Sequence, residues 1–125
     1  MSGRVVHFEI PTDQLDRAED FYRRAFGWET NSVPGMGYTL VGTTPSGDSG
    51  PTEPGAINGG MFVRDDKLTA PVVTIEVDDI DQTLKTVESL GGRTVRARMP
   101  VGDMGFAAYF ADTEDNIIGL WENSA

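Results

Sequence analysis

Apolar and polar positions alternate with a period of two along residues 5–10, near the start of the chain. This period predicts a β-strand with one buried face, because successive side chains of a strand point to opposite sides. The alternation gives two sets of side chains, which are Val6, Phe8 and Ile10 on one face and Val5, His7 and Glu9 on the other. Pro11 lacks the backbone donor that a sheet uses, so we expect the strand to end there.

Residues 15–26 carry apolar side chains at helical spacing and charged side chains on the opposite side, which predicts an amphipathic helix. Thr12 or Asp13 can cap its first turn through a side-chain oxygen. Gly27 follows the last apolar position and can adopt the left-handed conformation that ends many helices.

Three further strands and one long loop follow this helix. Apolar residues bounded by turn residues predict strands at residues 28–33, 38–41 and 57–63. Residues 42–56 are rich in glycine, proline, serine and threonine and have no apolar periodicity, which predicts a loop. The polar residues 64–70 are the expected boundary between two modules.

The same order of elements then repeats. Residues 72–77 correspond to the first strand, with Thr74 in the place of His7. The acidic pair at residues 78–79 can cap a second helix, whose apolar stripe ends at Leu90 and which Gly91 and Gly92 terminate. The remaining strands are expected at residues 94–98, 106–111 and 117–122.

The order strand, helix and three strands, used twice, predicts an α+β fold. We expect one domain, residues 1–125, made of two modules at about residues 1–65 and 71–125. Each helix must bury one face of its sheet, so the opposite faces of the two sheets should curve around a common space. The side chains expected to point into it are His7, Glu9, Thr74 and Glu76, joined by Ile118, Leu120 and Glu122 if Glu122 faces inward.

Composition and charge exclude or disfavour several kinds of function. The 125 residues include no cysteine, which excludes disulfides, thiolate metal sites and cysteine nucleophiles. The formal net charge of −10 disfavours binding to nucleic acids and to anionic membranes. The sequence contains no signal-peptide pattern and no apolar run long enough to span a bilayer, so we expect a soluble, cytoplasmic protein.

His7 is the single histidine of the chain, and an imidazole can bind a metal or transfer a proton near neutral pH. The alternative is a half-buried histidine that is hydrogen-bonded to a neighbour. Glu122 can likewise ligate a divalent ion or act as a base, or it can be a solvated strand end. For Glu9 and Glu76 the favoured interpretation is a pair of solvated carboxylates near a rim, or partners of two arginines, Arg96 and Arg98.

Four segments of the chain together resemble the vicinal oxygen chelate superfamily, which includes glyoxalase I, bleomycin-resistance proteins and extradiol dioxygenases. The segments are, in order, VHFEIPTDQLDRAEDFYRRAFGW, INGGMF, VTIEVDDIDQTLKTVESLGG and MGFAAYFADTEDNIIGLWE. They are most similar to the small glyoxalase-like branch. The resemblance implies tandem βαβββ modules that form a curved mixed sheet around a cup, with the helices outside, and it implies a homodimer.

The resemblance also implies four positions that ligate a divalent ion, which fall at His7, Phe62, Thr74 and Glu122. His7 and Glu122 alone have ordinary donor atoms, so these two are the candidate metal ligands and catalytic residues. The ion would be Zn, Ni, Mn or Fe, and a site without metal stays open. The residues expected to line the cup and bind the substrate are Phe62, Thr74, Trp28, Tyr38 and Phe106.

Two functions of different classes remain open at this point. The first is a glyoxalase-like enzyme, a lyase, isomerase or dioxygenase, in which an ion at His7 and Glu122 chelates two adjacent substrate oxygens. The second is a metal-free protein of the bleomycin-resistance type that sequesters a small ligand. A duplicated ferredoxin-like regulatory domain would need fewer strands between its helices than the pattern predicts.

Overall fold

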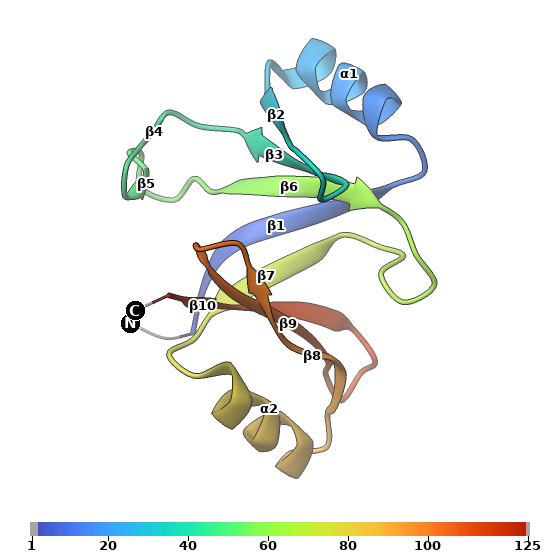
Figure 1. Ribbon diagram of the computed structural model, residues 1–125, viewed down its shortest axis with the longest axis vertical. Coiled ribbons are helices and arrows are strands. Elements are labelled where there is room, and N and C mark those ends of the chain that lie inside the picture. Colours follow the sequence, from blue (N-terminus) through green and yellow to red (C-terminus); the bar gives the residue numbers. More distant parts are fainter. Residues whose placement is uncertain (1–2, 125) are drawn as a thin grey trace. The chain divides into compact units, whose positions relative to one another are not determined.

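The computed structural model describes residues 3–124 (Figure 1). The chain divides into two compact units. Residues 7–71 form one, which we name the His7 unit, and the residues before 7 together with those from 72 onward form the other, which we name the Glu122 unit. Among the described residues, no helix has the length and apolar character that crossing a membrane requires.

The His7 unit is a sheet with one helix against it. Its elements are β1 (Arg4–Thr12, from His7 onward), α1 (Leu15–Phe26), β2 (Glu29–Val33), β3 (Tyr38–Gly42) and β6 (Asn58–Val63). The strands follow the order β2-β3-β6-β1, in which β1 and β6 are parallel and the other pairs antiparallel. The helix lies against the face that carries Thr39, because the Thr39 hydroxyl donates to Glu19 at 2.7 Å.

The Glu122 unit repeats this arrangement. Its elements are β7 (Val72–Glu76), α2 (Ile80–Ser89), β8 (Arg93–Val101), β9 (Gly105–Ala111) and β10 (Ile117–Asn123), in the strand order β7-β10-β9-β8. Strands β7 and β10 are parallel, and β9 is antiparallel to both of its neighbours. The buried core between α2 and the sheet consists of Val77, Ile80, Leu84, Ala108 and Leu120. Each of the larger of these side chains contributes roughly 1.5–3 kcal/mol by leaving water.

The predicted α+β fold class is confirmed, with strand, helix and three strands occurring twice. Two helix ends also match the sequence expectations. Gly27 ends α1 in the left-handed conformation, with φ of 74°. The Asp79 side chain caps α2 by accepting a hydrogen bond from the backbone N–H of Gln82.

Two expectations about the end of β1 are wrong. Pro11 does not end the strand, which continues to Thr12, where the backbone carbonyl accepts from the N–H of Arg64 at 2.7 Å. Neither candidate cap serves α1, whose N-cap is Gln14 without a side-chain hydrogen bond. Thr12 instead donates to the carbonyl of Phe62, and Asp13 pairs with Arg64, so tertiary contacts take both side chains.

The loop predicted at residues 42–56 contains a short antiparallel ribbon, β4 (Ser46–Gly47) and β5 (Gly50–Pro51). Asn58 anchors it: the Asn58 amide oxygen accepts from the N–H of Thr43 at 2.8 Å, and its amide nitrogen donates to Ser46 Oγ at 2.6 Å. In the Glu122 unit, β8 is longer than predicted and runs through to Val101, with two register irregularities against β9.

The expected orientation of β10 is also wrong. Leu120 lies in the core beneath α2, so Ile118, Leu120 and Glu122 share the face that the helix covers. Both faces of β10 carry apolar side chains, since Ile117 and Trp121 occupy the other one. Alternation along this strand therefore could not identify its buried face.

Candidate functional site

Three side chains meet on the face of the His7 unit that α1 leaves open. His7 and Glu9 lie two residues apart on β1 and therefore point to the same side. Tyr38 comes from β3, on the other side of β6. Its hydroxyl donates to Glu9 Oε2 at 2.8 Å and lies 2.9 Å from His7 Nε2. A phenol from one strand thus joins a histidine and a carboxylate from another.

Strand β6 lies between β3 and β1, and one of its residues, Gly60, allows the Tyr38 side chain to extend across it. Neighbouring strands are about 4.8 Å apart, so the Tyr38 side chain must cross the whole width of β6. It does so above Gly60, where a Cβ would overlap the tyrosine hydroxyl and ring carbons. Phe62 of β6 stacks on the Tyr38 ring, with ring centroids 6.5 Å apart and planes at 11°. Tyr38 is therefore fixed on two sides by β6.

Glu9 is not the solvated rim carboxylate that the sequence suggested. It is 7% exposed, and its Oε2 accepts a hydrogen bond from the Tyr38 hydroxyl. His7 is half-buried in the same cluster, and burial lowers the pKa of its imidazole, while the negative charge of Glu9 raises it. Because burial has the larger effect, the neutral imidazole is favoured near pH 7.

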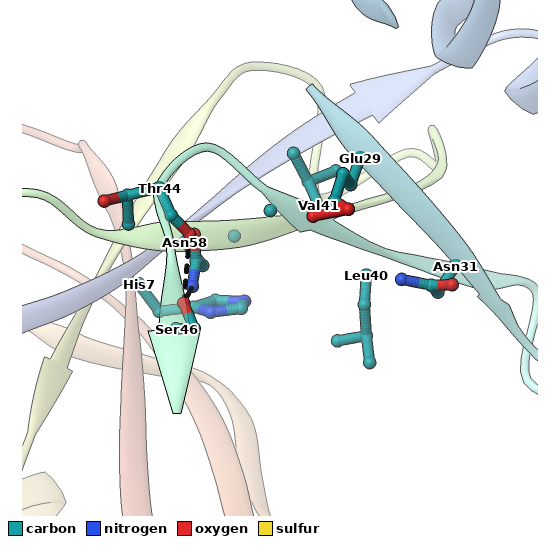
Figure 2. Close-up of a pocket in the computed structure, with 10 residues that line it drawn as sticks. His7, Glu29, Asn31, Leu40, Val41, Thr44, Ser46 and Asn58 are labelled. Carbon is teal, nitrogen blue, oxygen red and sulfur yellow. Dashed lines mark hydrogen bonds between the residues drawn. The ribbon is translucent and has the colours of Figure 1, made fainter. Parts of the chain in front are cut away.

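A pocket of about 350 Å³ opens beside His7 (Figure 2). The side chains that matter for its chemistry are His7, Glu29, Asn31, Leu40, Thr44 and Ser46. Strands β1, β2 and β3 supply the first four, and the loop before β6 supplies the last two. The Thr44 hydroxyl is buried and has no hydrogen-bond partner among the described residues. Polar groups thus come from two parts of the lining, an acid and an amide on β2 and hydroxyl residues in the loop.

Glu122 belongs to a separate network in the Glu122 unit. Its Oε1 accepts from the backbone N–H of Ile80, the first residue of α2, at 2.9 Å. Arg98 donates to Oε2 at 3.0 Å and stacks its guanidinium 3.5 Å from the centroid of the Phe106 ring. The Arg98 hydrogen bond, followed by the Ile80 N–H, holds the pKa of Glu122 below its usual value. Glu122 thus stabilises the start of α2.

The other predicted site residues occupy different surroundings. Trp28 packs between Phe8 of β1 and Tyr22 of α1, on the helix side of its sheet and away from the face of His7. Phe106 packs against the core beneath α2. Thr74 is buried beside Gly119 on the face of β7 opposite Ile75. Of the predicted set, the structure brings together His7, Tyr38 and Phe62.

Glu76, the counterpart of Glu9, has partners of its own within the Glu122 unit. Arg4 and Asn123 donate to its two carboxylate oxygens at 3.1 and 2.7 Å, and these bonds, the one from Asn123 most, lower its pKa. The expected partners Arg96 and Arg98 are not the ones that these hydrogen bonds use. The corresponding carboxylates Glu9 and Glu76 therefore accept hydrogen bonds from different kinds of side chain in the two units.

The donor chemistry of the candidate ligands does not fit a divalent ion. Glu122 is already neutralised by Arg98, and the Nε2 of His7 faces a phenol that is itself tied to Glu9. Within residues 3–124 no group of three or more His, Asp and Glu side chains could hold a metal ion. Catalytic zinc normally has three protein ligands.

Sequence reasoning missed Glu9 as a buried partner and Gly60 as the residue that admits Tyr38. One signal was present in the sequence, because a glycine inside a strand often marks a close approach of another group. Which group approaches depends on the register of β3 against β6, and a single sequence does not give that register.

Comparison with known proteins gives concordant results. Residues 4–44 match the family described as bleomycin resistance protein-like N-terminal. A Mycobacterium tuberculosis protein with the provisional name glyoxylase CFP32 is 29% identical over 120 residues, which are 91% of this chain and 43% of that protein. A glyoxylase-like domain-containing protein of Didymella fabae is 27% identical over 122 residues, 93% of this chain and 91% of that protein. The chain thus spans less than half the length of the mycobacterial relatives.

Solved structures with the same fold include two methylmalonyl-CoA epimerases. The Mycobacterium tuberculosis enzyme matches with a TM-score of 0.64 over 98% of this chain and 89% of that chain. The Streptomyces coelicolor enzyme, in complex with 2-nitronate-propionyl-CoA, matches with a TM-score of 0.67 over 100% of both chains. Sequence identity is 17% in both cases, so these matches establish the fold.

Proposed function

We propose that this chain, which is similar to the glyoxalase-like and bleomycin-resistance-like proteins of the vicinal oxygen chelate superfamily, binds a small polar molecule in the pocket beside His7. The observation that carries the proposal is the pocket itself, about 350 Å³ in volume and lined by His7 together with acid, amide and hydroxyl groups. Ligand sites of this size with a few placed polar groups are typical of small-molecule binding.

The lining favours a ligand that donates hydrogen bonds. The Glu29 carboxylate accepts hydrogen bonds only, and Asn31 can do both. A carboxylate in the wall and a formal net charge of −10 oppose anions, so the ligand class is neutral or cationic, with hydroxyl or amine groups.

A thermal-shift screen in EDTA tests this proposal, since a ligand that binds the folded state raises the melting temperature. The screen should contain small amines and polyols, with small carboxylates and phosphates as the contrasting set. We expect stabilisation by members of the first set. A screen in which anions alone stabilise the protein would contradict the proposed ligand class.

A pair of matched variants locates the binding. Leu40 lines the pocket and is 42% exposed, so Leu40→Arg fills the pocket at small cost to the fold. Val63, on neighbouring β6, is 53% exposed and lies outside the pocket lining. We expect Leu40→Arg to abolish the ligand-induced shift and Val63→Arg to preserve it. Equal shifts in both variants would place the ligand elsewhere.

A second candidate is catalysis on the bound molecule, as in a glyoxalase-like enzyme. The observation that favours it is the neutral, half-buried imidazole of His7 at the pocket wall, because such a group can accept a proton. Incubating each stabilising ligand with the protein in heavy water and following exchange of its carbon-bound hydrogens by NMR separates the two functions. Exchange that depends on His7 indicates catalysis, and its absence leaves binding alone.

A further inference from the structure

The hydrogen bonds around Tyr38 have only one consistent direction. A carboxylate oxygen can only accept, so the Tyr38 hydroxyl donates its single proton to Glu9. The Tyr38 hydroxyl oxygen also lies 2.9 Å from His7 Nε2, and in that contact it can only accept. Nε2 must therefore carry a hydrogen, and in a neutral imidazole the second nitrogen, Nδ1, then carries a lone pair.

From this geometry we propose that Glu9 and Tyr38 are positioning residues that fix His7 as the Nε2–H tautomer and leave Nδ1 as the hydrogen-bond acceptor of the pocket. The order of the three groups is Glu9 carboxylate, Tyr38 phenol, His7 imidazole. This role replaces the metal coordination that the family resemblance implies for His7.

The surrounding residues are arranged to keep this order. Gly60 leaves room for the tyrosine and Phe62 stacks on its ring, so the phenol has little freedom to move away. Glu9 is 7% exposed, and a buried carboxylate is costly unless its hydrogen bonds are satisfied. The Tyr38 hydroxyl supplies such a bond, which makes the direction of the chain costly to reverse.

The consequence for the ligand deepens the proposed function and rests on it. Among the described residues, the hydrogen bond of His7 runs through Nε2, so Nδ1 stays available at the wall that His7 forms. An available lone pair selects a ligand O–H or N–H group at this point of the pocket. A ligand that presents only acceptors would meet no donor from His7.

The tautomer can be measured without any ligand, because His7 is the only histidine of the chain. In protein labelled with ¹⁵N-histidine, a long-range proton–nitrogen spectrum distinguishes the nitrogen that bears hydrogen from the one with a lone pair. We expect the hydrogen-bearing nitrogen to be Nε2, identified by strong coupling to both ring C–H protons. A spectrum with the hydrogen on Nδ1 would overturn the proposal.

Two variants test whether the chain sets the tautomer. Tyr38→Phe removes the hydroxyl and keeps the ring, and Glu9→Gln keeps the shape and turns the acceptor into a mixed donor and acceptor. We expect each to produce a measurable fraction of the Nδ1–H tautomer. The matched controls are Thr39→Val and Glu19→Gln, which make the corresponding changes to the hydroxyl-to-carboxylate bond between the opposite face of β3 and α1. We expect both controls to retain the wild-type spectrum.

These measurements distinguish a failure of the positioning role from a failure of the proposed function. If Tyr38→Phe and Glu9→Gln both fold, as judged by near-ultraviolet circular dichroism, and leave the tautomer unchanged, the positioning role is wrong. If one of them fails to fold, the other decides. The spectrum of the ligand-free protein is independent of the screen, so an empty screen with the expected tautomer refutes the proposed function and leaves the positioning role intact.

Discussion

Tyr38 of β3 crosses β6 directly above Gly60, and its hydroxyl occupies the place that a Cβ at residue 60 would take. Tyr38 can adopt this conformation only because Gly60 has no side chain. The hydrogen-bonded link between His7 and Glu9 depends on that relationship, because it runs through the Tyr38 hydroxyl.

Gly60→Ala should therefore displace Tyr38 and break both of its hydrogen bonds. We expect a loss of roughly 1–3 kcal/mol in the free energy of unfolding, the usual range for an inserted methyl in a tight site. Chemical denaturation measures it. Gly42→Ala is the control, because a Cβ there would make ordinary contacts with Glu29 at 3.6 Å and beyond. A Gly60→Ala variant as stable as Gly42→Ala would show that Tyr38 can be accommodated elsewhere.

Removing the Glu122 carboxylate should weaken the start of α2. Glu122→Ala takes away the acceptor for the Ile80 N–H and the partner of Arg98, so we expect a loss of about 0.5–2 kcal/mol, as for other helix N-terminal caps. The control is Glu114→Ala, an exposed acid of the same unit whose side chain accepts from the adjacent Thr113. If both variants unfold at the same denaturant concentration, Glu122 has no capping role.

The same carboxylate gives a pH dependence of known sign. Its pKa is lowered in the folded protein from the ordinary value of 4.5, so the unfolded chain takes up the proton first as pH falls. The stability that Glu122 contributes is present above that ordinary value and is lost as pH falls through the folded-state pKa. Unfolding free energies of wild type and Glu122→Gln, measured between about pH 7 and pH 3, should converge toward the acid end. A constant difference across that range would contradict this assignment.

Metal content should be low and independent of His7. Protein purified without chelator, analysed by inductively coupled plasma mass spectrometry, should contain no stoichiometric Zn, Ni, Mn or Fe. The reasons are that Glu122 is paired with Arg98 and that, within residues 3–124, no three His, Asp or Glu side chains are grouped as metal ligands. His7→Ala should leave that metal content unchanged. One equivalent of metal in the wild type that disappears in His7→Ala would restore the metal-dependent enzyme.

The homodimer implied by the family resemblance remains a prediction. Sedimentation equilibrium over a range of protein concentrations measures it directly, and we expect a mass twice that of the 13.5 kDa chain. A mass that stays at one chain throughout the range would exclude the homodimer.

The fold was predictable because its signals are local. Period two in β1 and β7 and the helical stripes of α1 and α2 can be read from a few residues each, and their repetition gives the architecture. Orientation was predictable only where one face is clearly apolar. That condition holds for β7, where Ile75 contacts the core under α2, and fails for β10, where both faces are apolar.

The candidate site depended on contacts between distant residues. His7 and Glu9 could be placed on one face from the sequence, because they are two residues apart in a strand. Their link to Tyr38 needs the order of β1, β6 and β3 and the register of each pair, which no short segment encodes. The burial of Glu9 could not be predicted for the same reason, since the hydroxyl that bonds it comes from residue 38.

The anchored loop that carries Thr44 and Ser46 gives the two halves of the pocket different evolutionary freedom. One wall is made of sheet, where a substitution disturbs the pairing of several strands. The other wall belongs to the loop that contains β4 and β5, and hydrogen bonds from Asn58 to Thr43 and Ser46 hold this loop in place. As long as Asn58 and its two hydrogen bonds are kept, loop residues that lie outside the strands of the sheet can change without altering the strand pairing. Ligand preference can therefore diverge through substitutions in the loop alone, while the histidine and its supports stay constant.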